Sequence, residues 1–419
     1  MKPRPPTATT RPSRRSWTVL AVAVLVVTGT AGCGGSAHES KAALTASPHT
    51  HAPRARERPS RDRVEQLGSA RARKLAAEAD AVARQQRRLR ANPLATHPWG
   101  VYEGPREPAW VAYEHASGAN RTVLGAIAKQ PKAVWFTTHT SAGQIASQAR
   151  DYIARSQHGN PHALVQMALF NMRPWEGEAC HRLPSGAEQA SYRTWISNLA
   201  GAIGGTPAAI ILQPDGPFAL CAPHHSRIPS DLIAHAARTL SALPHTSVYV
   251  EAGAADWPAA GAQGGASAAA DLLIAGGVRY ARGFALNGTH YSATSAEISR
   301  GAEINAILQA RGIGKKHFVI NTAENGHPFV FGDYRGGDPD NATVCASRSV
   351  SAGTTCTTLG IPPTTDVANS RWGLPTTQAR IALNWVDGYL WFGRPWLVRQ
   401  AWPFSLSRAL QLVRSSPWF

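Results

Sequence analysis

Residues whose side chains can move protons or bind sugar hydroxyls recur within or shortly after short apolar runs of the chain. They are Trp135, Glu178, Asp215, Glu251, Trp257, Asn287, Asn321 and Arg394. Carboxyl groups serve as general acids and bases, and indole rings pack against the apolar C–H faces of sugars while offering an N–H. A single carboxylate after a strand is often only a helix N-cap. The combination, rather than any one residue, predicts a polyhydroxylated substrate.

The apolar runs that carry these residues alternate with segments of helical composition. The runs span residues 133–136, 163–170, 208–212, 247–250, 280–286, 317–320 and 388–392. Strands that alternate with helices indicate βα units and a parallel sheet. About seven runs predict an α/β fold with a distorted parallel (β/α) barrel. A doubly wound open sheet is the alternative, although no Gly-rich dinucleotide motif follows the first run. In a barrel, the side chains after the runs meet at one rim, where active sites are built.

Residues 1–33 predict an export signal with a lipobox-like cysteine. Several arginines precede an apolar run over residues 19–27, which is too short for a membrane-spanning helix. Small residues precede Cys33, as in the bacterial lipobox, so we expect a lipid anchor on the outer face of the cell membrane. Plain cleavage with release, or an uncleaved anchor, are the alternatives. Residues 34–91 predict a basic Ala-, Arg- and Pro-rich tether and helix, and residues 92–419 the catalytic barrel.

The positive charge of the chain is concentrated before the predicted barrel. Residues 1–92 contain 18 Lys and Arg against 6 Asp and Glu, and the whole chain has a net charge of +17. A charged tail creates no field at a binding cleft on the domain that follows it. We therefore expect no nucleic-acid partner, and we expect a monomer whose partners are a polysaccharide and the membrane.

Four cysteines follow the lipobox-like one, and export makes disulfides plausible among them. They are Cys180, Cys221, Cys345 and Cys356, and they permit three pairings that the sequence alone does not separate. We favour Cys180–Cys221 with Cys345–Cys356, and four reduced, buried thiols are the alternative. No paired C-x-x-C spacing occurs, so we expect neither zinc nor another cofactor.

Ordered segments between about residues 92 and 400 resemble the motifs of glycoside hydrolase family 6. Residues 211–215 (Ile-Leu-Gln-Pro-Asp) resemble the family's apolar-Glu-Pro-Asp signature. Residues 248–253, followed by Trp257, resemble its Tyr-x-Asp-Ala-Gly-His-x-x-Trp stretch. Residues 386–391, followed by Arg394, resemble its Val-Asp-Ala-x-x-Trp motif with the Lys-Pro that comes after it. Further similar segments are residues 92–93, 285–287, 318–322 and 325–326.

The resemblance implies a secreted hydrolase that cleaves β-1,4-glucan, or a related polysaccharide, with inversion at the reacting carbon. It implies that Asp215 donates the proton, with its pKa raised by burial or by a nearby carboxylate. Glu178 is our candidate for that neighbour, with Glu176 as the alternative. Glu251 would hold the water chain or act as the base. The sugar would be bound by Trp135, Trp257, Asn287, Asn321 and Arg394.

The chain departs from the family's motifs at several acidic positions. Ala179 stands where the family has the Asp that supports the proton donor, and Gln400 stands where it has the proposed base. Gln213 replaces a Glu beside the donor, Glu251 replaces an Asp, and Ala254 replaces a His. These departures motivate an alternative hypothesis, a catalytically impaired, membrane-tethered carbohydrate-binding protein.

Overall fold

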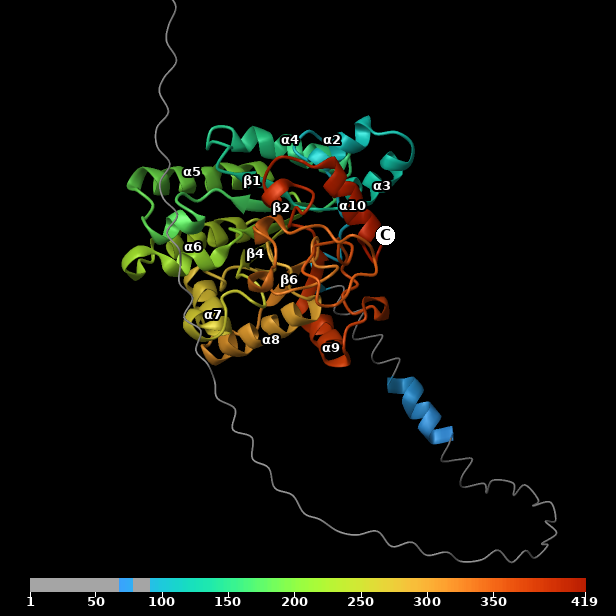
Figure 1. The fold of residues 1–419 in the computed structure, drawn as a ribbon. Coiled ribbons are helices and arrows are strands. Elements are labelled where there is room, and N and C mark those ends of the chain that lie inside the picture. The colour runs from blue at the N-terminus through green and yellow to red at the C-terminus, as the bar shows by residue number, and fades with distance from the viewer. Residues whose placement is uncertain (1–67, 78–90) are drawn as a thin grey trace, which may run out of the picture. The chain divides into compact units, whose positions relative to one another are not determined.

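Seven parallel strands stand side by side in chain order and form one curled sheet (Figure 1). The computed structural model describes residues 68–77 and 91–419. The strands are β1 (Val134–Thr137), β2 (Val165–Phe170), β3 (Ala208–Leu212), β4 (Thr246–Glu251), β5 (Gly283–Leu286), β6 (His317–Asn321) and β7 (Val386–Leu390). The N–H of Ala133, before β1, donates to the carbonyl of Trp391, after β7, over 2.8 Å. The two edge strands therefore approach each other, and the predicted distorted parallel barrel is confirmed.

Helices follow the strands and surround the sheet, and Figure 1 shows α4 to α9 along its outer side. The helices are α2 (Pro108–His115), α3 (Gly118–Ala128), α4 (Ile145–Gln157), α5 (Gly186–Ile203), α6 (Ile228–Ser241), α7 (Gly265–Ala275), α8 (Thr294–Ala310), α9 (Thr376–Trp385) and α10 (Leu406–Ser415). Helix α5 begins with a capping box, in which Ser185 and Glu188 each accept a backbone N–H of the other. Residues 68–77 form an exposed helix within the predicted tether and helix of residues 34–91.

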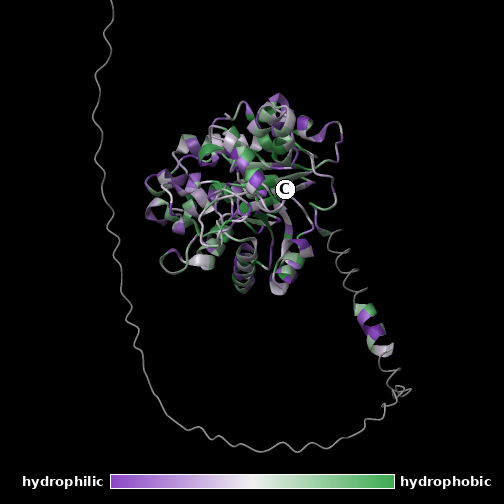
Figure 2. Ribbon diagram, turned by 45° about the vertical axis from the view of Figure 1, so that its right-hand side comes forward, coloured by the Kyte–Doolittle hydropathy of each residue, from purple (hydrophilic) through white to green (hydrophobic). Residues whose placement is uncertain are grey.

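The strands are apolar on both faces because both faces are covered. In β3, for example, Ile210 and Leu212 pack in the cluster that includes the surrounding helices, whereas Ile211 packs with Tyr249 and Val319 inside the barrel. This alternation follows from the two-residue period of a strand. Figure 2 shows the apolar residues gathered along the sheet and the polar ones toward the outer helices. The packed sheet is the rigid support on which the loops are mounted.

The expected export signal, Cys33 and most of the tether lie outside the described residues. Within residues 68–77 and 91–419, no helix combines the length and the apolar character needed to cross a membrane.

A buried carboxylate joins several strands near their N-terminal ends. Asp387 in β7 is fully buried, accepts a hydrogen bond from Tyr249 Oη at 2.7 Å and pairs with Arg282 Nε at 2.9 Å. His317 Nδ1 lies 3.0 Å from its other oxygen, and Asn92 donates to its backbone carbonyl. Burial alone would raise the pKa of Asp387, but His317 and Arg282 outweigh it and lower that pKa to about 2.

We expect this carboxylate to make the stability of the barrel depend on pH. The pKa of Asp387 is lower in the folded state than the ordinary value of about 3.9, so its stabilisation is present above about pH 4. It is lost as the pH falls through about 2, and it amounts to about 2 kcal/mol. Urea denaturation of the wild type and of Asp387→Asn between pH 7 and pH 2 measures it. The variant should lose less stability on acidification; parallel pH curves would contradict the assignment.

Candidate active site

A cleft of about 1070 Å³ opens where the strands end. Side chains from the ends of the seven strands, or from the segments that follow them, reach it, as the barrel prediction required. Its walls include Trp135, Phe170, Glu176, Asp215, Phe218, Trp257, Thr289, His290, Phe331, Asp340, Arg394, Gln400 and Trp402. The cleft thus joins aromatic rings, carboxyl groups and an arginine in one space large enough for several sugar units.

Asp215 lies in the turn between β3 and the short 3-10 helix η2 (Gly216–Cys221). Its φ of 61° places it in the left-handed region, which few residues other than glycine adopt and which often marks functional sites. Thr289 Oγ1 donates to Asp215 Oδ1 over 2.9 Å. Burial raises the pKa of Asp215 to about 6, because the Thr289 hydrogen bond offsets only part of the desolvation and Glu176 adds its own negative charge. A carboxyl group with such a pKa can hold a proton near neutral pH.

Glu251 lies behind Asp215 rather than in the cleft. Its side chain is 1% exposed and accepts backbone N–H groups from Gly216 at 2.8 Å and from Gly253 at 2.9 Å. A Cβ at position 216 would collide with the Glu251 carbonyl, so only glycine permits this close approach. Burial raises the pKa of Glu251 well above its usual value, and Asp215 raises it further. Our hypothesis of Glu251 as the base needs correction, because the structure makes it a support for the turn that carries Asp215.

Glu178 does not face Asp215, contrary to our prediction. It is exposed in the 3-10 helix η1 (Glu176–Cys180), where Arg182 binds it over 2.7 Å and also pairs with Glu188. Its neighbour Glu176 lines the cleft instead, and burial together with Asp340 raises the pKa of Glu176. Glu176 and Glu178 are only two residues apart in η1 but their side chains have different surroundings. The carboxylate near Asp215 is therefore Glu176, the alternative that the sequence left open.

Three of the five expected sugar-binding residues line the cleft. Trp135 and Trp257 are both in its wall, and the Arg394 guanidinium lies 4.0 Å from the centroid of the Trp135 ring. Trp135 Nε1 donates to the carbonyl of Phe392 over 2.7 Å, which fixes the indole. Burial lowers the pKa of Arg394 to about 10, so the guanidinium remains charged at neutral pH.

The two expected asparagines are buried beneath the cleft and do not reach it. Asn287 Nδ2 donates to the carbonyl of Asn321 over 3.1 Å, and Asn321 Nδ2 donates to the carbonyl of Asn287 over 2.9 Å. The Oδ1 of Asn321 also accepts the backbone N–H groups of Phe392 and Gly393. These amides tie the end of β6 to the loops after β5 and β7, and their buried position does not support the predicted contact with sugar.

Sequence reasoning assigned no binding or catalytic role to several residues of the cleft wall. Trp402 is 72% exposed at the rim, and Asp340 comes from a 3-10 turn, η6 (Pro339–Asn341), in a long segment without periodicity. Thr289 and His290 follow β5. The only sequence signal for His290 was a polar residue after an apolar run, because no recognised motif includes it. Gln400 enters from η8 (Val398–Gln400), and its Nε2 donates to the carbonyl of Thr289 over 2.9 Å.

Two disulfides stabilise the loops, with the pairing that we favoured. Cys180–Cys221 joins η1 to η2 and so connects the segments that carry Glu176 and Asp215. Cys345–Cys356 closes a short loop in the segment between β6 and β7. Across residues 68–77 and 91–419, no three His, Cys, Asp or Glu side chains gather as metal ligands would.

Comparison with known proteins supports a glycosidase-like site. The model of the glycosyl hydrolases family 6 matches residues 101–372. Endoglucanase A of Cellulomonas fimi is 30% identical over 232 residues, which is 54% of this chain and 47% of that protein, so the chain spans about half of that relative. Endoglucanase 1 of Streptomyces halstedii is 30% identical over 237 residues, or 54% of this chain and 70% of that protein.

A solved structure has the same barrel. The endoglucanase Cel6 of Mycobacterium tuberculosis, determined in complex with methyl-cellobiosyl-4-deoxy-4-thio-β-D-cellobioside, is 28% identical with a TM-score of 0.58. The alignment covers 77% of this chain and 98% of that one. Since the family model also covers more than half of the sequence, the chain belongs to the glycosyl hydrolases family 6.

Proposed function

We propose that this protein hydrolyses β-1,4-glucan, or a closely related polysaccharide, with Asp215 as the general acid. One observation carries the proposal: a carboxyl group with a pKa of about 6 lies in the wall of a large cleft together with Trp135 and Trp257. The indoles would stack on the sugar rings, and the protonated Asp215 would donate to the glycosidic oxygen as its bond breaks. The relatives named endoglucanases agree with this substrate class.

The direct test is product formation from polysaccharides of different linkage. We expect reducing ends to be released from carboxymethylcellulose and mixed-linkage β-glucan, and not from β-1,3-glucan or α-glucan. Proton NMR during cellopentaose hydrolysis should show the α-anomer first, because the proposed reaction inverts the configuration. An initial β-anomer would reject inversion, and the absence of products from every β-1,4-glucan would reject hydrolysis.

We expect the alkaline limb of the pH profile to report Asp215. The group must be protonated to act, so kcat/KM should fall as the pH rises through about 6, by about tenfold for each further pH unit. Thr289 donates to the carboxyl group and lowers its pKa, so Thr289→Val should move this limb to higher pH. Initial rates on cellopentaose between pH 4 and pH 9 measure both curves. A limb that stays in place in the variant would contradict the assignment.

One observation favours the alternative function, a binding protein without turnover. Gln400 occupies the cleft at the position that corresponds to the family's proposed base, and an amide cannot accept a proton from water at neutral pH. Calorimetry with cellopentaose separates the two functions. Binding with no product after a day would favour the binder, and hydrolysis within minutes would exclude it.

We also propose that the protein acts as an exported monomer that is anchored through a lipid on Cys33. The apolar run before Cys33 and the two disulfides support export. Fractionation of cells that express the wild type or Cys33→Ala tests the anchor: the wild type should sediment with membranes and the variant should not. Size-exclusion chromatography with light scattering tests the monomer.

A further inference from the structure

The proposed hydrolysis needs a second group that takes a proton from the attacking water. Besides Asp215, the cleft wall has four side chains that can accept one: His139, Glu176, His290 and Asp340. Within the described residues, no hydrogen bond fixes the side chains of His139, Glu176 and Asp340, and all three are exposed. His290 differs, because it is 9% exposed and held from several sides.

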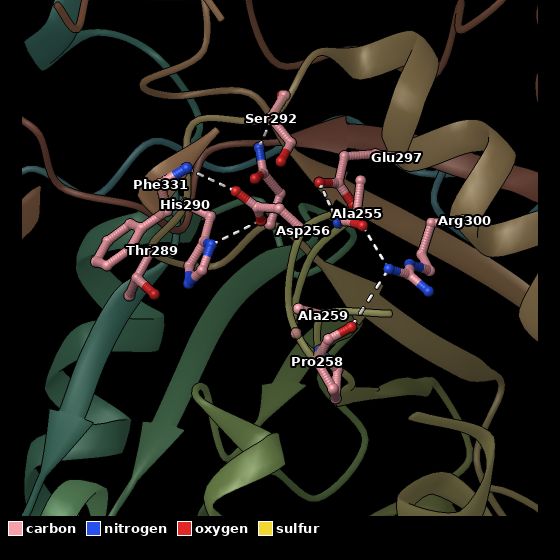
Figure 3. A network of polar contacts seen from close by, with 12 residues as sticks. Ala255, Asp256, Pro258, Ala259, Thr289, His290, Ser292, Glu297, Arg300 and Phe331 are labelled. Atoms are coloured by element: carbon pink, nitrogen blue, oxygen red, sulfur yellow. Dashed lines mark hydrogen bonds and ion pairs between the residues drawn. The ribbon is translucent and has the colours of Figure 1, made fainter. Parts of the chain in front are cut away.

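A carboxylate fixes one edge of the His290 imidazole (Figure 3). His290 Nδ1 and Asp256 Oδ1 lie 2.7 Å apart, and the other oxygen of Asp256 accepts the backbone N–H of Phe331, also over 2.7 Å. With the carboxylate as acceptor, Nδ1 carries the proton, and Nε2 of the neutral ring keeps a free lone pair. Among the described residues, Nε2 has no hydrogen-bond partner, while the ring itself lines the cleft. The pair therefore presents a basic nitrogen of defined tautomer.

The loop that carries Asp256 is itself held in place. Glu297, fully buried in α8, accepts the backbone N–H of Ala255 over 2.7 Å, and Arg300 donates to the carbonyl of Ala255 (Figure 3). Ala255, the residue directly before Asp256, is thus tied to one helix through both its N–H and its carbonyl. This support leaves the carboxylate little freedom to move away from His290.

Aromatic rings hold the plane of the imidazole. The His290 ring is nearly parallel to that of Trp257, at 5° with centroids 5.4 Å apart, and to that of Phe331, at 20° with centroids 4.3 Å apart. Stacking and the Asp256 contact together fix the orientation of the ring, which is the condition for efficient proton transfer. An ordinary surface histidine has neither constraint.

Three carboxyl groups interact electrostatically with His290. Burial would raise the pKa of Asp256, but the hydrogen bond and charge of His290 outweigh it and lower that pKa. The charge of His290 also lowers the pKa values of Asp215 and Asp340, although burial raises both above their ordinary values. Three carboxyl groups are therefore close enough to stabilise the imidazolium that forms when the ring accepts a proton.

We propose that His290, oriented by Asp256, is the proton acceptor of the hydrolysis. The place of Gln400 supports this assignment. Gln400 stands where the family has its proposed base, and its amide donates to the carbonyl of Thr289, the residue directly before His290. The proposal depends on the proposed function. As the water oxygen bonds to the anomeric carbon, the glycosidic C–O bond breaks. Asp215 gives its proton to the leaving oxygen, and the water proton passes to His290 Nε2. The imidazolium then releases that proton to solvent, and Asp215 takes one up.

The test uses the full chain and compares His290→Asn with Asp256→Asn and with His225→Asn, a matched loss of an exposed imidazole outside the cleft. We expect His290→Asn to lower kcat on cellopentaose by roughly 10²–10⁴-fold with KM changed by less than about threefold. Asp256→Asn keeps the ring but leaves the wrong nitrogen protonated, so its kcat should also fall by at least about 10²-fold. His225→Asn should match the wild type.

Azide separates a missing base from a damaged site, because azide attacks without having to lose a proton. We expect azide to restore part of the rate of both variants and to yield an α-glycosyl azide, seen by NMR. A His290→Asn variant that keeps kcat within threefold, or that loses activity only through KM, would overturn the proposal, as would the absence of rescue in Asp256→Asn with cellopentaose binding intact. A wild type without hydrolysis would instead refute the proposed function.

Discussion

Asp215→Asn is expected to lower kcat on cellopentaose by roughly 10²–10⁴-fold, the usual contribution of a general acid. The amide keeps the size of the side chain and can still accept the Thr289 hydrogen bond, but it has no acidic proton for the glycosidic oxygen. The loss should be much smaller on 2,4-dinitrophenyl β-cellobioside, because a dinitrophenolate leaves without being protonated. Steady-state kinetics on the two substrates measure the difference.

Asp231→Asn is the matched control for this experiment. Asp231 is exposed at the start of α6 and pairs only weakly with Arg227, at 3.5 Å, so its replacement should leave the rate unchanged. If Asp215→Asn lost the same factor on both substrates, the residue would serve in binding or folding, and its role as the acid would be rejected.

Glu251→Ala is expected to lower the free energy of unfolding by about 3–5 kcal/mol, since it combines a cavity with two lost hydrogen bonds. The change leaves the buried N–H groups of Gly216 and Gly253 without their acceptor. Because Gly216 directly follows Asp215, we also expect kcat on cellopentaose to fall. Urea denaturation at pH 7 and steady-state kinetics measure the two effects.

Two further variants make the Glu251 result specific. Glu251→Gln retains one acceptor oxygen but turns an NH₂ group toward the other N–H, so its loss of stability should be intermediate. Glu303→Ala removes an exposed carboxylate from α8 and should change the stability by less than about 0.5 kcal/mol. Equal stability of Glu251→Ala and the wild type would show that the two N–H groups are satisfied in another way.

The architecture was largely predictable because strands that are buried on both faces must be apolar along their whole length. The run at residues 208–212 coincides with β3, and the run at 317–320 falls one residue short of the end of β6. The run at 280–286 began three residues before β5, because the apolar Tyr280 and Ala281 precede the strand in a turn. An apolar run predicts which residues are buried. It does not predict where the strand begins, because that also depends on the backbone of the turn before it.

The site was predictable mainly where a residue lies within a family-like motif near the C-terminal end of a strand. Asp215, Trp257 and Arg394 meet that condition, and all three line the cleft. Asn287 directly follows β5, but its φ of 70° is in the left-handed region, and its amide is buried against the last residue of β6. Glu178 turned outward to an arginine four residues away. Side-chain direction in loops depends on tertiary contacts, which a strand pattern does not encode.

The relative position of the Glu176 and Asp215 carboxyl groups depends on the Cys180–Cys221 disulfide as well as on folding. The barrel has a packed core of its own, whereas the link between the loops of Glu176 and Asp215 requires an oxidant. Protein made in a reducing cytosol would thus lack the covalent link between the loops that carry Glu176 and Asp215. Redox history would then help to distinguish an active preparation from an inert one.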